Sequence, residues 1–253
     1  MGNNKKNHVC TIISKTQLCH GTFDYVVDFP IQPKPGQFIH ILCGEGVLLR
    51  RPMSVCDYSD NRLRFVFDVR GEGTKRLAKH NVGDKLDILG PLGTGFNIDK
   101  KGSGTPIVIG GGIGIFPLYL TSKQLGSNVE SILGFKTKDL VIMEQDFKSV
   151  CSKVHVCTDD GSYLSCGLVT DLFKERLKQG DITSVYACGP NAMMKAVAKI
   201  SKEYNIFCEL SLEQRMGCGI GACAVCVCKI AGQYKKVCQN GPVFNAKEVD
   251  FDE

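Results

Sequence analysis

Polar and apolar positions alternate over short runs in the first hundred residues. Three runs stand out, the last alternating cleanly: residues 23–29, 38–42 and 62–69. Turn-forming segments rich in glycine and proline, such as residues 90–93, separate these runs. Short strands between such turns predict a small antiparallel β-barrel over residues 1–100. One helix is expected at residues 75–79, with Thr74 as its N-cap.

From residue 101 onward, apolar runs alternate with longer helical stretches. The predicted strands are residues 106–109, 129–135, 153–157 and 184–188. Helices are expected after the glycine-rich turn at residues 110–114, from Val169, and over residues 191–204. This alternation predicts an α/β domain over residues 101–207, with a mainly parallel sheet and helices on both faces.

The last segment, residues 208–253, is dense in glycine and cysteine and shows little periodicity. We predict a third, small domain here, so the chain as a whole is multi-domain. The segment is too short to bury a large core, so something other than apolar packing is expected to hold it. Its acidic end, residues 248–253, is expected to be a solvated tail.

Composition and charge exclude several classes of protein. The net charge of +5 is small and gathers in no stripe, which argues against a nucleic-acid-binding protein. Residues 102–122 lack charge, but their glycines and prolines exclude a membrane-spanning helix. There are fourteen cysteines, and the N-terminus has no apolar run of the signal-peptide kind. We therefore expect a cytoplasmic location, where close cysteines indicate metal or redox chemistry.

Four cysteines form the strongest motif. Cys218, Cys223 and Cys226 follow the C-x4-C-x2-C spacing of plant-type [2Fe–2S] sites, and Cys238 follows as a fourth ligand from outside the loop. Intervening glycines can turn backbone N–H groups toward the sulfurs. A zinc site and buried structural thiols are the alternatives. Cys228 is expected to point away, although it could replace Cys226 in another register.

Three weaker motifs indicate cofactor phosphates. Arg51 lies on an extended segment that ends at Ser54, and the glycine turn at residues 71–74 opens a helix, whose N-terminus suits a phosphate. Residues 110–117 form a glycine turn between a strand and a helix, the context of a nucleotide-binding loop. Residues 188–190, Cys-Gly-Pro, should also lie at the carboxyl edge of the sheet, where ligands bind.

The nucleotide motif departs from the usual Rossmann pattern. No acidic residue follows the next predicted strand; Lys136 and Lys138 stand there instead. These lysines would suit a 2′-phosphate, or they are simply solvated. The choice between NADH and NADPH therefore stays open.

Together the motifs resemble the ferredoxin–NAD(P)+ reductase superfamily, which joins a flavin-binding β-barrel to a nucleotide domain. Residues 213–223 and 237–244 are similar to those of electron-transfer subunits of class 1B dihydroorotate dehydrogenases, bacterial enzymes of pyrimidine synthesis. The resemblance covers essentially the whole chain. It implies three cofactors: FAD, a [2Fe–2S] cluster and NAD(H).

The resemblance also assigns residues to each cofactor. It implies an FAD site of Arg51, Pro52, Met53, Ser54, Asp68, Val69, Arg70, Gly73 and Thr74. Arg51 would contact the phosphates and Ser54 would lie near flavin N5. The nucleotide would lie against Gly111, Gly112, Gly114, Cys188, Gly189 and Pro190, and the cluster on Cys218, Cys223, Cys226 and Cys238. Two departures stand out: Met53 replaces the superfamily's tyrosine, and Leu164 replaces an expected glycine.

The implied function is electron transfer through FAD and the cluster, between NAD(H) and a separate FMN-containing catalytic subunit that oxidises dihydroorotate. A heterotetramer with two copies of each chain and an apolar docking face around the cluster are expected. No acid or base catalyst is expected in this chain, because the chemistry belongs to the cofactors. The alternatives are the small subunit of an NAD(P)H–ferredoxin oxidoreductase or sulfide dehydrogenase, and a non-catalytic iron–sulfur sensor.

Overall fold

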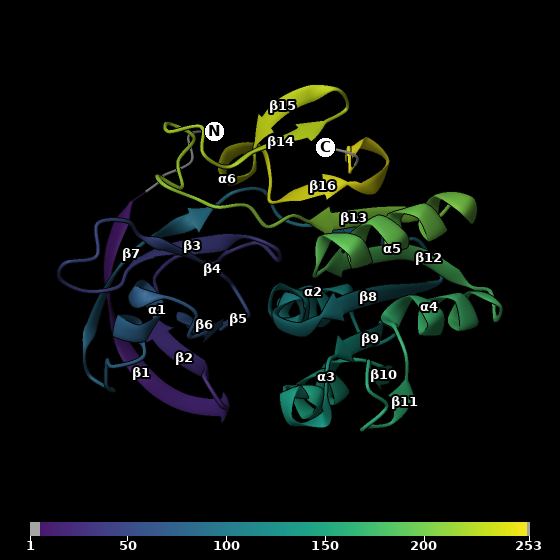
Figure 1. Ribbon diagram of the computed structural model, residues 1–253, viewed down its shortest axis with the longest axis horizontal. Helices are drawn as coiled ribbons and strands as arrows, with labels where there is room; N and C mark the ends of the chain where they lie inside the picture. The colour runs from purple at the N-terminus through teal and green to yellow at the C-terminus, as the bar shows by residue number, and fades with distance from the viewer. Residues whose placement is uncertain (1–5, 252–253) are drawn as a thin grey trace.

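The computed structural model describes residues 6–251. The N-terminal residues on which the signal-peptide expectation rests lie largely outside this range. The first sheet, on the left of Figure 1, has the strand order β4-β3-β7-β1-β2-β6-β5, and every pairing is antiparallel. Its strands are β1 (Asn7–Cys19), β2 (Thr22–Asp28), β3 (Phe38–Leu42), β4 (Arg51–Ser54), β5 (Asp57–Ser59), β6 (Arg62–Asp68) and β7 (Lys85–Leu92).

The first sheet coils around its own apolar core. Its inward-facing side chains, among them Tyr25 and Phe65, are fully buried. The short helix α1 (Glu72–Leu77) covers this core with Leu77, and the hydroxyl of Tyr25 donates a hydrogen bond of 2.9 Å to the Leu77 carbonyl. The predicted N-cap is wrong. Gly71 caps the helix, and the Thr74 hydroxyl reaches back from the first turn to accept hydrogen bonds from the backbone N–H groups of Arg70 and Gly71.

The second sheet is mostly parallel, with the order β11-β10-β9-β8-β12-β13-β16. Its strands are β8 (Thr105–Gly111), β9 (Glu130–Phe135), β10 (Lys153–Thr158), β11 (Ser165–Cys166), β12 (Ile182–Cys188), β13 (Phe207–Ser211) and the antiparallel β16 (Val243–Asn245). The helices are α2 (Phe116–Leu125), α3 (Glu144–Val150), α4 (Val169–Leu177) and α5 (Asn191–Glu203). Short 3-10 turns are η1 (Ile98–Lys101), η2 (Gly112–Ile115) and η3 (Lys138–Leu140).

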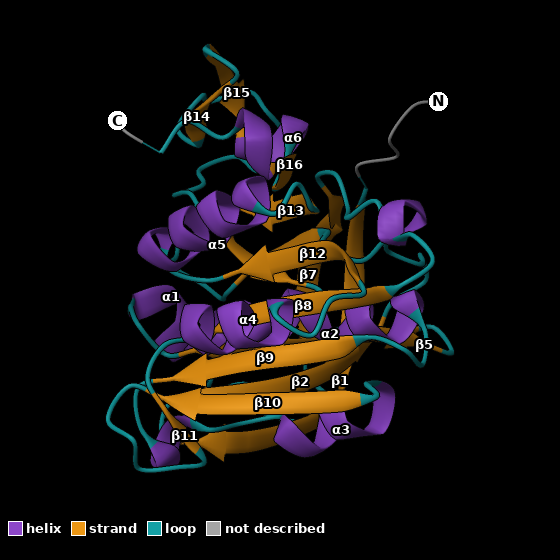
Figure 2. Cartoon of the chain, turned by 90° about the vertical axis from the view of Figure 1, so that its right-hand side faces the viewer, coloured by secondary structure: helices purple, strands orange, loops and turns teal. Residues whose placement is uncertain are grey.

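Helices cover both faces of this sheet, whose strands lie one above the other in Figure 2. α4 and α5 pack on one face, where Phe173 and Met194 meet Ile109. α2 and α3 pack on the other face, which also contacts the first sheet through residues such as Val66 of β6. The predicted fold class, an antiparallel flavin-type barrel followed by an α/β domain, is thus confirmed. Among residues 6–251, no helix is long and apolar enough to cross a membrane.

The C-terminal segment forms a hairpin, β14 (Val227–Ile230) and β15 (Gln233–Lys236), and a short helix α6 (Val237–Asn240), followed by β16 and η4 (Ala246–Glu248). In Figure 1 the yellow hairpin stands above both sheets. Contrary to expectation, apolar packing does hold this segment, because Ile230 and Val237 join a core shared with Phe38 and Leu92 of the first sheet.

The predicted solvated tail is also wrong up to residue 251. Val249 pairs with Ile230 in a β-bridge, Asp250 accepts a hydrogen bond from the Gly232 N–H, and Phe251 packs against the shared core. Apolar residues between the acidic ones anchor the tail. Its last two residues lie outside the described part of the chain.

Candidate functional site

A cavity of about 750 Å³ opens between the two sheets. Asp68 and Arg70 line it from the end of β6, and the glycine turn after β8 and the Cys-Gly-Pro turn after β12 line it from the second sheet. It therefore brings together eight residues assigned to cofactors from the sequence: Asp68, Arg70, Gly111, Gly112, Gly114, Cys188, Gly189 and Pro190. A cavity at the carboxyl ends of parallel strands is the usual ligand site of such a sheet.

The two turns interlock because they are built from glycine. A Cβ on Gly114 would collide with the Cys188 carbonyl oxygen, and one on Gly111 would lie 2.7 Å from the Met193 sulfur. Gly112 has φ +54 and nothing within 4 Å of its Cβ position, so its backbone is open to a ligand. Burial raises the pKa of the Cys188 thiol to about 12, so this side chain is uncharged in the cavity wall.

Several lining residues were not assigned from the sequence. Asp159 follows β10 and lines the cavity, as does Glu213, which comes two residues after β13. The signal for Asp159 was its position after a predicted strand, whereas Glu213 begins the segment 213–223 that carries the resemblance but was assigned to no cofactor. Of the two lysines considered for a 2′-phosphate, Lys136 lines the cavity. The ammonium of Lys138 lies 5.9 Å from the centre of the Tyr163 ring.

The other residues assigned to FAD lie outside this cavity. Arg51 and Gly73 are in contact, since a Cβ on Gly73 would lie 2.8 Å from Arg51 Nε. The Arg51 guanidinium donates a hydrogen bond of 2.6 Å to the Leu49 carbonyl, which holds it beside the start of α1. Pro52 and Ser54 are half-buried on β4. This arrangement can place a guanidinium and backbone N–H groups around one phosphate.

The remaining residues assigned to FAD are Met53, Val69 and Thr74. Met53 is buried in the core of the first sheet, and Val69 packs against that core, so neither side chain presents a polar group to a ligand. Thr74 is occupied by the helix start described above. Asp68 is fixed by a hydrogen bond of 2.7 Å from the Thr22 hydroxyl. Leu164, where a glycine was expected, adopts φ +51, so the turn keeps a glycine-like conformation with a leucine.

The cysteine loop, residues 218–226, turns its backbone toward its own sulfurs. Sγ of Cys218 accepts hydrogen bonds from the N–H groups of Ile220, Ala222 and Cys223, at 3.5, 3.2 and 3.3 Å. Burial opposes ionisation of Cys218, but these N–H groups outweigh it and lower its pKa to about 6. The thiolate is the form that binds iron, so a thiol that ionises readily suits a cluster ligand.

The four cysteines lie as two pairs. The Cys218 N–H donates to Sγ of Cys223 at 3.4 Å, and the Cys238 N–H donates to Sγ of Cys226, also at 3.4 Å. Across residues 6–251, no three potential ligand side chains converge as they would around a single metal ion. Two pairs of thiolates fit the ligand demand of a two-iron cluster, in which each iron takes two cysteines.

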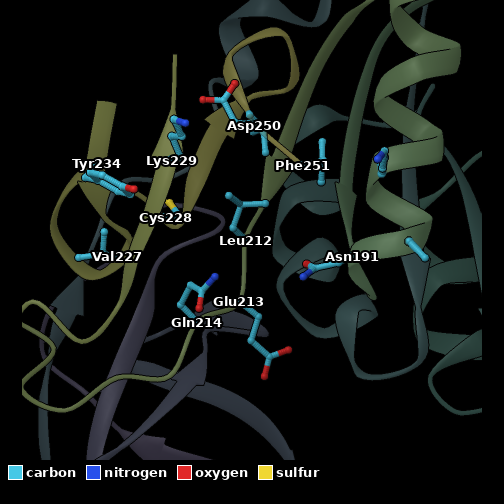
Figure 3. A pocket seen from close by; sticks show the side chains of 13 residues that line it. Asn191, Leu212, Glu213, Gln214, Val227, Cys228, Lys229, Tyr234, Asp250 and Phe251 are labelled. Atoms are coloured by element: carbon cyan, nitrogen blue, oxygen red, sulfur yellow. The ribbon is translucent and has the colours of Figure 1, made fainter. Parts of the chain in front are cut away.

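Cys228 lies on a different surface from these pairs. It lines a second cavity, of about 370 Å³, between the hairpin and the start of α5. Figure 3 shows its sulfur among residues that include Leu212 and Tyr234. Burial raises the pKa of this thiol, as it does that of Cys238, so the position of Cys228 and not its pKa distinguishes it from the proposed ligands.

These features define a class of protein: a flavin- and nucleotide-binding reductase of the ferredoxin–NAD(P)+ reductase type with an added iron–sulfur region. The family model described as "Iron-sulfur cluster binding domain of dihydroorotate dehydrogenase B" matches residues 213–250. The NADH-dependent reduced ferredoxin-NADP oxidoreductase structure is similar over 100% of this chain and 92% of its own, with 32% identity and a TM-score of 0.86.

Two curated relatives narrow the class. Both are named dihydroorotate dehydrogenase B (NAD(+)), electron transfer subunit. The protein from Geobacillus thermodenitrificans (strain NG80-2) is 41% identical, and that from Bacillus caldolyticus is 44% identical. Each match covers 94% of this chain and 96% of the relative. The chain belongs to the family of electron transfer subunits of NAD-dependent dihydroorotate dehydrogenase B.

Proposed function

We propose that this chain carries electrons through FAD and a [2Fe–2S] cluster, between NAD(H) and an FMN-containing catalytic subunit that oxidises dihydroorotate. The observation that supports this best is the 750 Å³ cavity, because it joins the end of β6 in the first sheet to both glycine turns of the second. A flavin and a nicotinamide must meet face to face, and this cavity lies where the two proposed binding regions meet. Pyrimidine synthesis is then the proposed pathway, and the cytosol the proposed location.

Each proposed site has its own residues. Arg51, with the backbone at Gly73 and Thr74, would bind the FAD phosphates; Pro52, Met53, Ser54 and Val69 would shape the flavin site, and Asp68 and Arg70 would border it at the cavity. The glycine and Cys-Gly-Pro turns would bind the nucleotide. Cys188 would contact the nicotinamide ring as an uncharged thiol, so it would place no negative charge beside the ring.

Cys218, Cys223, Cys226 and Cys238 are the proposed cluster ligands, and their pairing supports the [2Fe–2S] type. When bound, FAD supplies exchange of an electron pair with the nucleotide and of single electrons with the cluster. The protein's part is to hold these groups, exclude water and tune them. Domain boundaries are proposed at residues 1–100 for FAD, 101–207 for the nucleotide and 208–253 for the cluster.

The proposed exit for electrons is the exposed side of the cysteine loop. Cys223 is exposed there, and the apolar Ile220 and Val225 on the same loop are 40% and 56% exposed. Apolar side chains beside a redox centre suit docking of a protein partner. We propose that the catalytic subunit binds this face in a heterotetramer of two copies of each chain.

Spectroscopy and co-purification test this function. The purified chain should show flavin absorbance and a reducible [2Fe–2S] signal, and NADH should bleach the flavin rapidly. Co-expressed with the catalytic subunit, it should support NAD+-dependent oxidation of dihydroorotate. Absence of the flavin or of the cluster would refute the proposal, and slow flavin reduction would favour a sensory role.

A second candidate is the small subunit of an NAD(P)H–ferredoxin oxidoreductase. The TM-score of 0.86 with such an oxidoreductase structure favours it specifically. Ferredoxin reduction without any orotate-forming partner would support this second function. Orotate formation by the co-purified complex would support the first.

A further inference from the structure

His40 is a fully buried histidine on the strand beside the proposed flavin motif. It is 0% exposed at the centre of β3 and lies opposite Pro52 of β4 in the antiparallel register. Its two isoleucine neighbours on β3 belong to the core of the first sheet. Because side chains alternate along a strand, His40 points to the opposite face, toward the cysteine loop.

The ring of His40 lies directly against Gly219 of that loop. A Cβ on Gly219 would lie 2.5 Å from His40 Nδ1 and 3.0 Å from Cε1. Gly219 also has φ +71, a conformation that favours glycine. The approach of the ring and the turn of the loop therefore both depend on the missing side chain at residue 219.

The polar atoms of His40 have no regular hydrogen bonds inside the described structure. Both ring nitrogens are buried without a partner. Whether neutral or protonated, the imidazole ring carries at least one N–H donor. A buried donor without a partner is costly, so its presence calls for an explanation.

We propose that His40 is a positioning residue that fixes the cysteine loop at Gly219 and Cys218 against the flavin strand β4. Its N–H would bond the loop backbone once the loop closes around its cluster. This inference rests on the proposed function, which places flavin at β4 and the cluster on the loop. His40 is not among the residues assigned to a cofactor, and its contact with the loop is at Gly219.

Loss of the His40 ring is expected to change the reduction potential of the cluster more than the stability of the fold. Three backbone N–H groups reach Sγ of Cys218, and hydrogen bonds to cluster sulfurs help to set the reduction potential. If the loop shifts after loss of the ring, these bonds lengthen and stabilise the added electron less. We therefore expect a lower potential for the cluster and an unchanged one for the flavin.

The test measures redox potentials and the electron paramagnetic resonance spectrum of the reduced full-length holoprotein. His40→Leu keeps an apolar side chain but removes the donor, whereas His40→Asn places an amide N–H near the position of Nδ1. Loss of one hydrogen bond is worth roughly a tenfold change in equilibrium, or about 59 mV for one electron. We expect His40→Leu to lower the cluster potential by that amount and alter its spectrum, and His40→Asn to restore both.

An unchanged cluster potential in His40→Leu, or an equal shift of the flavin potential, would overturn the inference. If His40→Leu fails to load a cluster, the contact itself is tested by Gly219→Ala alone and combined with His40→Ala. We expect Gly219→Ala to lose cluster absorbance and the double variant to regain part of it, and no recovery would overturn the inference. A wild-type protein without a cluster would instead refute the proposed function.

Discussion

Gly73→Ala should weaken FAD binding by displacing Arg51, with little effect on the fold. The new Cβ would lie 2.8 Å from Nε and 3.1 Å from Cζ of Arg51, too close for either atom to stay. The long side chain can swing away, so the clash costs little stability. Alanine also favours the helix that contains residue 73, by about 1 kcal/mol relative to glycine. The displaced guanidinium, however, can no longer reach the proposed phosphate.

The size of the effect follows from the lost contact. A hydrogen bond to a charged group is worth about 1.5–3 kcal/mol, and each 1.4 kcal/mol is a factor of ten in affinity. We therefore expect the dissociation constant of FAD to rise about 10- to 150-fold. Titration of FAD into flavin-free protein, followed by flavin fluorescence, measures this constant, and thermal unfolding checks the fold.

Gly71→Ala is the matched control in the same turn. Gly71 has an extended backbone, φ −148, and no atom within 4 Å of its Cβ position, so FAD affinity should stay nearly unchanged. In an Arg51→Ala background, Gly73→Ala should cost no further affinity, because the displaced group is already absent. Equal losses in Gly71→Ala and Gly73→Ala, or a full additional loss in the Arg51→Ala background, would refute the reasoning.

Three further predictions concern the cluster, the contact between the sheets and an ion pair in the second sheet. Cys226→Ser should abolish the iron–sulfur absorbance and Cys228→Ser should retain it; the reverse result would exchange their roles. Arg64, with an 18% exposed side chain, bridges aspartates of β2 and α3, so Arg64→Leu should lower the free energy of unfolding by about 2–4 kcal/mol. Lys123→Ala, which breaks a more exposed pair, should cost less than about 1 kcal/mol, and similar losses in denaturant titrations would contradict this. Burial disfavours the Glu130 carboxylate, but its arginine and histidine partners outweigh burial and lower its pKa. The ionised carboxylate therefore stabilises the fold above about pH 4.3, and this stabilisation is lost as the pH falls through the lower pKa of the folded state. Glu130→Gln should be less stable than the wild type at pH 7, and the difference between the two proteins should shrink on acidification. A difference in the free energy of unfolding that stays constant with pH would argue against this prediction.

The fold was predictable where the pattern of a segment depends only on its own strand or helix. In the run 62–69 every second residue faces the core of the first sheet, although Val66 on the other side of the strand is buried as well, and the structure places β6 at Arg62–Asp68. The start of α1 was misplaced because a glycine caps it, and glycine marks helix starts less clearly than threonine. The tail was misjudged because Phe251 acquires its apolar partners only through tertiary packing.

The same distinction between local patterns and long-range contacts applies to the candidate site. The glycine turns and the cysteine spacing are local, so the sequence marks them directly. The sequence assigned neither Glu213 nor His40 to the site, because one reaches the cavity after the chain has crossed the second sheet and the other meets Gly219 from far away in the chain. Contacts between segments more than a hundred residues apart need the assembled structure.

The order of the proposed cofactors follows from strand neighbours. β4 carries Arg51 and pairs with β3, and β3 presents His40 to the cysteine loop. The sheet coils so that β6 contacts β4, and Asp68 at the end of β6 opens onto the cavity where the nucleotide turns lie. A flavin held at β4 and extending to that cavity would therefore have the nucleotide at one edge and the cluster loop near the other. We propose that electrons pass between the nucleotide and the cluster through this flavin.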